Sequence, residues 1–257
     1  MGKIEKMIKI ILGNVGSGKT ALAVREMFVN KLNRKTYSNI ITKNLKNVVP
    51  ITPKMIIKEE ISTYKKNRKT GKEEAVYKHT LNIEFWKGIK EPINVVLDEA
   101  HSIINARRSM SKINIIVTDW IALIRRVLGQ SESGYGELVL ISQLANRIDV
   151  IAREMCTNVV YVICHYLKSC KVCGTTWKEN SEMPEGFWNC PGCNSTSIKK
   201  HSHEVEVWHF PNMQLYQAWK QYAQQSFYKH YIVRDIEKYF PLYNTLQWDN
   251  LFSEFYA

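Results

Sequence analysis

One loop constrains this chain more than any other segment, because residues 13–20 match the phosphate-binding pattern G-x-x-x-x-G-K-T. An apolar stretch at residues 7–12 precedes the loop, and residues 19–31 have the spacing of a helix. The glycines let backbone N–H groups turn toward an anion, and the helix directs its positive dipole end at the same point. The order strand, loop, helix predicts an α/β nucleotide-binding fold. The loop comprises Gly13, Asn14, Val15, Gly16, Ser17, Gly18, Lys19 and Thr20.

Two side chains of this loop suit a bound triphosphate. Lys19 can reach the β- and γ-phosphates, and the Thr20 hydroxyl can ligate Mg²⁺. The alternative is an ordinary glycine turn, but every fixed position of the pattern is present between a strand and a helix. The loop therefore predicts ATP and Mg²⁺ as cofactors.

A second apolar stretch, residues 93–99, ends in Asp98 and Glu99. Parallel strands present their carboxyl ends at one edge of a sheet, so Asp98 should lie next to the loop. A carboxylate in that place holds Mg²⁺, and Glu99 can orient or deprotonate an attacking water. The alternative is a strand that simply ends in acids.

The next predicted strand, residues 138–143, adds a polar group and leads to a cationic one. Gln143 ends this buried strand, where a polar side chain is costly without a partner, and we expect it to sense the γ-phosphate or the water. Phosphoryl transfer develops charge that an arginine can stabilise, and Arg153 is the favoured candidate. The other candidates are Arg107, Arg108 and Arg147, and a surface or DNA-contacting role is the alternative for each of these arginines.

Six cysteines include the pairs Cys170/Cys173 and Cys190/Cys193, which are sixteen residues apart. Two C-x-x-C pairs at this spacing are typical of a four-thiolate structural Zn²⁺ site. The segment is too short for a core of its own, so metal binding would supply its folding energy. Two disulfides or free thiols are the alternative. The sequence leaves open whether this zinc ribbon touches DNA or a partner protein, or is an inert brace.

The remaining pattern indicates apolar strands that alternate with helices, and hence a mostly parallel sheet covered on both faces. The basic segment 65–72 reads as a loop or a frayed helix end, either solvated or in contact with nucleic acid. The ribbon should lie at the tip of a hairpin formed by strands 159–167 and 203–210. Further predictions are a strand at 36–42 and helices at 120–128, 149–156 and 213–224.

The net charge is +12, from 36 Lys and Arg against 24 Asp and Glu. Such an excess suggests a polyanionic partner, nucleic acid before an anionic membrane surface. No apolar run approaches the ~18 residues that span a bilayer. The loop at residue 13 interrupts the only stretch that resembles a signal peptide. We therefore expect a cytoplasmic protein, in the host cytoplasm if it is viral, with reduced cysteines.

Taken together, residues 13–20, 97–101, 106–110 and 141–153 resemble the FtsK–HerA superfamily of P-loop ATPases. Within it they are most similar to the zonular-occludens-toxin-like branch of filamentous phage assembly proteins and to viral genome-packaging ATPases. The resemblance implies a RecA-like core, a homo-oligomeric ring of commonly six subunits, and ATP-driven movement of DNA. The matching motif positions are Lys19, Thr20, Asp98, Glu99 and Gln143. Phage assembly proteins of this type normally have a transmembrane helix, which this sequence lacks.

We therefore divide the chain into an ATPase core (1–167), a zinc-ribbon insertion (168–200), and a return strand with an aromatic-rich helical segment (201–257). The predicted function is an ATP-hydrolysing motor that translocates double-stranded DNA, as in viral genome packaging. One alternative is an ATPase of virion assembly or export with a virion protein as cargo. Another is a nucleotide-gated binding module whose ribbon recruits a partner.

Overall fold

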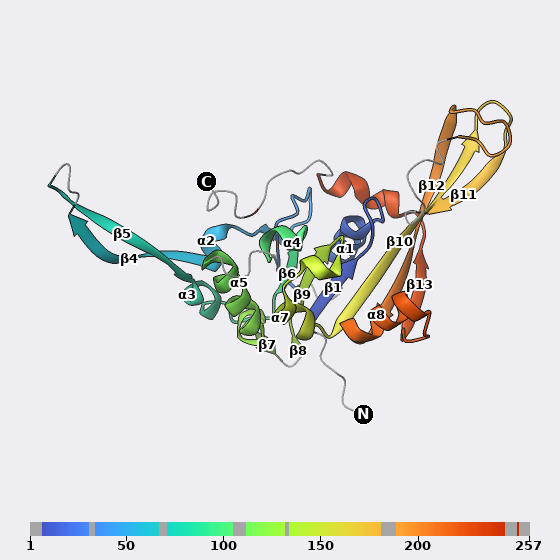
Figure 1. The fold of residues 1–257 in the computed structure, drawn as a ribbon. Helices are drawn as coiled ribbons and strands as arrows, with labels where there is room; N and C mark the ends of the chain where they lie inside the picture. The colour runs from blue at the N-terminus through green and yellow to red at the C-terminus, as the bar shows by residue number, and fades with distance from the viewer. Residues whose placement is uncertain are drawn as a thin grey trace.

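The computed structural model describes residues 7–30, 34–66, 71–104, 112–131, 134–180, 189–244 and 251, and its central element is one large sheet (Figure 1). The strand order is β13-β12-β10-β1-β9-β6-β2-β3, with β11 paired to β10. Pairing is parallel from β10 to β3 and antiparallel among β10, β11, β12 and β13. The predicted α/β class with a mostly parallel sheet is confirmed.

The strands of this sheet are β1 (Ile8–Leu12), β2 (Thr36–Ser38), β3 (Val48–Pro50), β6 (Asn94–Leu97), β9 (Leu138–Ser142), β10 (Asn158–Cys170), β11 (Thr176–Asn180), β12 (Ile198–Phe210) and β13 (Lys229–Val233). The α-helices are α1 (Lys19–Phe28), α2 (Pro53–Ile56), α3 (Ile83–Lys87), α4 (Ala100–Ile103), α5 (Lys112–Ala122), α6 (Ile124–Leu128), α7 (Val150–Glu154) and α8 (Met213–Tyr222). Two short 3₁₀ helices are η2 (Ala145–Arg147) and η3 (Ile236–Leu242). Two separate hairpins are β4 (Ile57–Lys66) with β5 (Glu73–Leu81), and β7 (Gln130–Ser131) with β8 (Gly134–Tyr135).

Both faces of the sheet are covered, so alternate residues of one strand enter different cores. Ile8, Ile10 and Leu12 pack on the side of α5, α6 and α8, whereas Ile11 packs on the side of α1 and η3. All five residues of β1 are buried, as expected for a central parallel strand. This burial holds the loop that follows β1 at a defined position.

The predicted hairpin of strands 159–167 and 203–210 is confirmed, and both strands are longer than predicted. β10 and β12 pair from Val159 and Phe210 to Cys170 and Ile198, and the four-cysteine ribbon lies at their far end (Figure 1). The same two strands therefore belong to the main sheet and to the ribbon. The division at residues 168 and 200 stays a proposal.

The prediction of a loop or frayed helix end for the basic segment 65–72 was wrong for Lys65 and Lys66, whereas Gly71 and Lys72 lie outside any helix or strand, as a loop predicts. Lys65 and Lys66 end β4 and face Glu74 and Glu73 of β5 across an antiparallel ladder. Ile, Thr, Tyr and Val, which favour strands, are interspersed among the charged residues of 57–66 and 73–81, and the prediction took only the basic residues into account. Smaller differences are that α1 ends at Phe28, β2 ends at residue 38, and the helix expected at 120–128 is the end of α5 plus α6. In the described part of the chain, no helix is long and apolar enough to cross a membrane.

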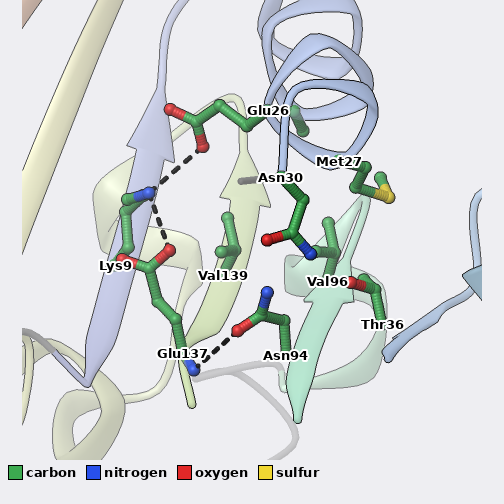
Figure 2. Close-up of a pocket in the computed structure, with 10 residues that line it drawn as sticks. Lys9, Glu26, Met27, Asn30, Thr36, Asn94, Val96, Glu137 and Val139 are labelled. Atoms are coloured by element: carbon green, nitrogen blue, oxygen red, sulfur yellow. Dashed lines mark hydrogen bonds and ion pairs between the residues drawn. The ribbon is translucent and has the colours of Figure 1, made fainter. Parts of the chain in front are cut away.

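A buried lysine ties three elements together at the amino ends of the parallel strands (Figure 2). The ammonium of Lys9 on β1 lies 3.1 Å from Glu26 Oε2 on α1 and 2.8 Å from Glu137 Oε2 before β9. Burial lowers the pKa of Lys9, but the two carboxylates outweigh burial and raise it well above its usual range. The group is therefore a charged, doubly paired lysine inside the fold. Next to it lies a cavity of about 190 Å³ between α1 and the sheet.

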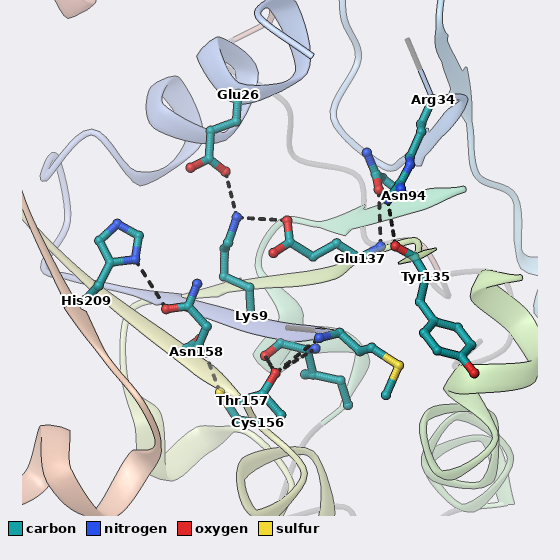
Figure 3. Close-up of polar contacts among 12 residues, drawn as sticks. Lys9, Glu26, Arg34, Asn94, Tyr135, Glu137, Cys156, Thr157, Asn158 and His209 are labelled. Carbon is teal, nitrogen blue, oxygen red and sulfur yellow. Dashed lines mark hydrogen bonds and ion pairs between the residues drawn. The ribbon is translucent and has the colours of Figure 1, made fainter. Parts of the chain in front are cut away.

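More polar contacts surround this lysine (Figure 3). The Asn94 side-chain oxygen accepts a hydrogen bond from the Glu137 N–H at 3.1 Å, which anchors the acid beside β6. On the other side, Asn158 Oδ1 accepts a hydrogen bond from the Tyr228 hydroxyl at 2.9 Å and lies 3.2 Å from His209 Nδ1. These contacts lie at the amino ends of the parallel strands, where the antiparallel β12 ends, and thus at the opposite end of β1 from loop 13–20.

Replacing Lys9 with Met should lower the free energy of unfolding by about 3 kcal/mol near pH 8, because two carboxylates lose their buried cation. In this variant the two neighbouring carboxylates repel each other, and protonation of either one removes the repulsion. The loss of stability relative to the unmodified protein should therefore shrink as the pH falls to about 5. Lys9 itself has a raised pKa, so its contribution in the unmodified protein is complete throughout this range. Urea unfolding at both pH values measures the effect.

The matched control is Lys87→Met, which removes an exposed lysine 3.2 Å from Glu84. An exposed pair contributes little, so this variant should change stability by less than about 1 kcal/mol. A Lys9→Met deficit that grows toward acid pH would contradict the interpretation.

Candidate functional site

The loop after β1 is packed so tightly that side chains are excluded at two of its glycines. A Cβ at Gly13 would lie 2.5 Å from the Val162 carbonyl oxygen of β10. Gly18 adopts φ +85°, and its Cβ would lie 2.9 Å from Val205 of β12. The left-handed φ and the close approach both require glycine. β10 and β12 therefore support the loop from behind, and Val15 at its front is 73% exposed.

The side chain of Lys19 folds back onto the first residues of its own loop. Its ammonium donates to the carbonyl oxygens of Gly13 at 2.9 Å and Asn14 at 2.8 Å. Burial lowers the pKa of Lys19, while the charges of Asp98 and Glu99 oppose that shift. The loop thus carries a desolvated cation at its centre, which is suited to attract phosphate oxygens.

The structure brings the loop and the end of β6 together. The Thr20 hydroxyl donates a 2.7 Å hydrogen bond to Asp98 Oδ2. Burial raises the pKa of Asp98, and the hydrogen bond from Thr20 opposes that rise. A hydroxyl and a carboxylate oxygen at this distance are two hard oxygen donors that could serve one Mg²⁺.

Asn39, which the sequence analysis did not identify, holds Asp98 from the neighbouring strand. Its Oδ1 accepts from the Asp98 N–H at 2.7 Å, and its Nδ2 donates to the Asp98 carbonyl at 3.0 Å. The side chain thus extends the parallel pairing of β2 with β6, whose last backbone pair is Ser38 and Val96. Asn39 falls inside the strand predicted at 36–42, so no sequence signal marked it as a strand-end side chain, and its neighbour on β6 could not be identified from the sequence.

Glu99 is the N-cap residue just before α4. Its backbone is left-handed, with φ 49° and ψ 41°, which is uncommon for a residue other than glycine. Its N–H donates to Asp98 Oδ1 at 2.8 Å, and its side chain is half exposed. Glu99 Oε2 lies 3.2 Å from His101 Nδ1, which is 3.5 Å from the Ser142 hydroxyl at the end of β9. His101 thereby connects the predicted base to the strand that leads to the half-buried Gln143.

The candidate arginines for the finger lie on different elements of the structure. Arg153 on α7 donates from Nε to the Ile148 carbonyl at 3.1 Å, and Arg147 is exposed on η2. Arg107 and Arg108 lie outside the described residues. The role of an arginine finger stays a prediction for Arg153 and Arg147.

A tyrosine that the sequence analysis also missed connects β10 to the loop. The Tyr166 hydroxyl donates to the Gly16 carbonyl at 2.7 Å, and burial raises the pKa of this phenol. Its ring contacts that of His203 edge-on, with centroids 5.2 Å apart. Tyr166 lies just before the register shift at which β10 continues into the cysteine ribbon.

The four ribbon cysteines converge as the spacing predicted. Their sulfur atoms all lie within 4.8 Å of one another, and the Cys170–Cys193 and Cys173–Cys190 separations are 3.5 Å. These separations suit four thiolates around one tetrahedral metal ion. None of the six cysteines forms a disulfide. The cluster could therefore bind a metal.

The two halves of the cluster have matching backbone conformations. The Val172 N–H donates to Cys170 Sγ and the Gly192 N–H to Cys190 Sγ, both at 3.3 Å. Gly174 and Asn194, each four residues after the first cysteine of its pair, adopt left-handed φ values of 74° and 58°. Hydrogen bonds from Thr175 lower the pKa of Cys173 to about 6, which favours the thiolate that a metal requires.

Comparison with known proteins gives one family and several similar structures. The model of the family described as zonular occludens toxin (Zot) matches residues 7–166. The N-terminal domain of zonular occludens toxin from Neisseria meningitidis is 15% identical, with a TM-score of 0.45, 93% of this chain covered and 98% of that one. The genome packaging NTPase B204 from Sulfolobus turreted icosahedral virus 2, in complex with AMP, is 13% identical, with a TM-score of 0.37, 61% of this chain covered and 74% of that one. No curated protein sequence matches the chain.

Cys190→Ser should lower the metal content of the purified protein and expose the ribbon to protease, because three thiolates and a hydroxyl hold a metal less well than four thiolates. Elemental analysis of reduced protein measures the metal, and Cys164→Ala, which removes a buried thiol outside the cluster, is the control. Equal metal content in both variants would rule the cluster out as the binding site.

Proposed function

The chain belongs to the zonular occludens toxin family, and we propose that it hydrolyses ATP to ADP and phosphate where loop 13–20 meets the end of β6. The observation that carries this proposal is the 2.7 Å hydrogen bond between Thr20 and Asp98. It places a phosphate-loop hydroxyl against a strand-end carboxylate, with the desolvated Lys19 in the same loop. An ammonium beside two hard oxygen donors is what a triphosphate with Mg²⁺ requires.

Each residue has a distinct task in this proposal. The N–H groups of loop 13–20 and the Lys19 ammonium bind the phosphates, as the N-terminus of α1 favours anions. Thr20 and Asp98 would hold Mg²⁺, which supplies neutralisation of phosphate charge. Asn39 positions Asp98 through its two backbone contacts. Zn²⁺ is the proposed ion of the four cysteines, with a structural role.

Glu99 is the proposed general base. It would accept a proton from the water as the water oxygen bonds to the γ-phosphorus and the bond to the ADP oxygen breaks. His101, 3.2 Å away, is the positioning residue for Glu99. Gln143 is proposed as a sensor of the γ-phosphate and Arg153 as the finger supplied to a neighbouring subunit in a ring.

For the cargo we propose double-stranded DNA, moved through such a ring during genome packaging. The net charge of +12 supports a polyanionic partner, and the motif order supports a motor. The family match favours a second candidate, an ATPase of virion assembly and export. Stimulation of ATP hydrolysis by DNA separates the two.

Glu99→Gln should retain ATP binding but reduce turnover by about 10²–10⁴-fold, because the amide cannot accept the proton. Lys19→Ala should lose binding itself, since the loop then lacks its cation. Nucleotide binding by calorimetry and phosphate release by a coupled assay distinguish the two variants. Normal turnover by Glu99→Gln would show that the base has been misassigned.

Duplex DNA should increase the ATPase rate of the unmodified protein, and this stimulation should fall steeply between about 50 and 200 mM salt as phosphate contacts are screened. The rate without DNA, measured over the same salt range, is the control. A rate that does not respond to DNA at low salt would favour the assembly and export function.

A further inference from the structure

The β4–β5 hairpin projects from the body of the molecule as a two-stranded arm (Figure 1). Its base is buried at Ile57, whereas most of the residues from Lys58 to Lys66 are exposed. An isolated two-stranded hairpin is marginally stable in water, because neither of its faces is covered. The arm therefore needs either a polar surface on both faces or a partner.

One face of the arm is apolar at its centre. The pairs Ile61–Tyr77 and Tyr64–Ala75 lie side by side on this face, since directly opposed residues of a ladder point the same way. Ile61 is 50% exposed, and Tyr64 and Tyr77 are each 60% exposed. We call these four residues the arm patch.

A β-bulge gathers the arm patch on one face. The register shifts between Ile61 and Thr63, so that Tyr64 is paired with Ala75 rather than with Glu74. Without this extra residue, the alternation of the strand would place Tyr64 on the face opposite to Ile61. The irregularity thus places three large apolar side chains together, although no described part of the chain covers them.

Opposite charges flank the arm patch at its two ends. On the body side lie Glu59 and His79, which are 3.1 Å apart, and on the tip side lie Lys66 and Glu73. A two-fold axis through the centre of the patch, across the strands, would place Glu59 of one arm opposite Lys66 of a second arm. The same rotation would place His79 opposite Glu73. This face is therefore complementary to itself when two copies run antiparallel.

We propose that the arm patch is an interface between two copies of this chain, which pack their arms face to face and antiparallel. The opposite face of the arm does not offer this surface, because Glu60 there is paired with Lys58 at 3.3 Å and with Lys78 at 3.7 Å. The proposal does not depend on the nucleotide site. A ring-forming contact elsewhere on the molecule would be compatible with it.

The size of the arm predicts a weak association. Ten residues at about 3.4 Å each, in two strands about 4.8 Å apart, offer only a few hundred Å² per copy. This area lies in the range of transient interfaces, below the ~800 Å² per partner of stable ones. The contact must therefore be measured at high protein concentration or trapped covalently.

Cysteine trapping tests the geometry directly. Ala75→Cys places a thiol about one residue, roughly 3.4 Å along the strand, from the proposed axis. Facing sheets lie about 10 Å apart, which is too far for a direct disulfide, so a short bifunctional thiol-reactive cross-linker should join two copies covalently. Val76→Cys, one residue along and on the opposite face, is the matched control and should remain monomeric. The unmodified protein, treated identically, accounts for any reaction of the ribbon cysteines. Equal cross-linking of the two variants, or none for Ala75→Cys, would overturn the proposal.

Charge reversal gives an independent measurement by sedimentation without nucleotide. Glu59→Lys or Lys66→Glu alone should weaken association about tenfold, because each opposes like charges. The double variant should restore it, since both intermolecular pairs are then reversed. The control reversal of Glu60 and Lys65 on the other face should change nothing. A double variant as weak as the single ones would contradict the pairing.

A nucleic-acid role for the arm is the competing outcome. Tyr64→Ser with Tyr77→Ser should reduce self-association and leave the affinity for a labelled duplex unchanged. Loss of DNA affinity with unchanged self-association would identify the arm as a DNA-binding element instead, and would overturn the proposed interface.

Discussion

The parallel pairing of β1 between β9 and β10 is the constraint on which the rest of the molecule depends. It buries the strand on both sides, directs its carboxyl end to one edge of the sheet, and leaves the chain to turn at once into α1. The turn succeeds because Gly13 and Gly18 leave no side chain between the loop and β10 or β12. The conformation of loop 13–20 therefore depends on strand packing as much as on the sequence of the loop.

Polar groups hold both ends of this sheet, in different ways. At the carboxyl edge, Thr20, Asn39 and Asp98 form a short hydrogen-bonded series across three elements. At the amino edge, Lys9 is held by Glu26 and Glu137. Buried charge contributes little net stability, but it penalises any strand register that leaves a partner behind. The ion pairs of Lys9 therefore favour the observed register of β1 with β9.

Two parts of the molecule, the cysteine ribbon and the β4–β5 arm, project from it without a hydrophobic core of their own. Each therefore requires another source of stability, and the two differ in what that source can be. The ribbon gathers four thiols at the end of β10 and β12, where a metal can replace a hydrophobic core. The arm exposes apolar side chains for which the described chain has no cover. Tyr166 links the ribbon to the sheet edge, because it lies on the strand that carries the ribbon and its hydroxyl donates to the Gly16 carbonyl of loop 13–20.

The sequence by itself determined the fold class, the glycine-rich turn of loop 13–20 between β1 and α1, the acids at the end of β6 and the four converging cysteines. Each of these depends on residues close together in the chain, or on one strand following another in a parallel sheet. Only the tertiary structure revealed Asn39, Tyr166 and the partners of Lys9, because their contacts join residues 59, 150, 17 and 128 positions apart. Only the tertiary structure likewise showed that Lys65 and Lys66 belong to a hairpin strand, because pairing across a hairpin depends on a register and a bulge that composition does not encode.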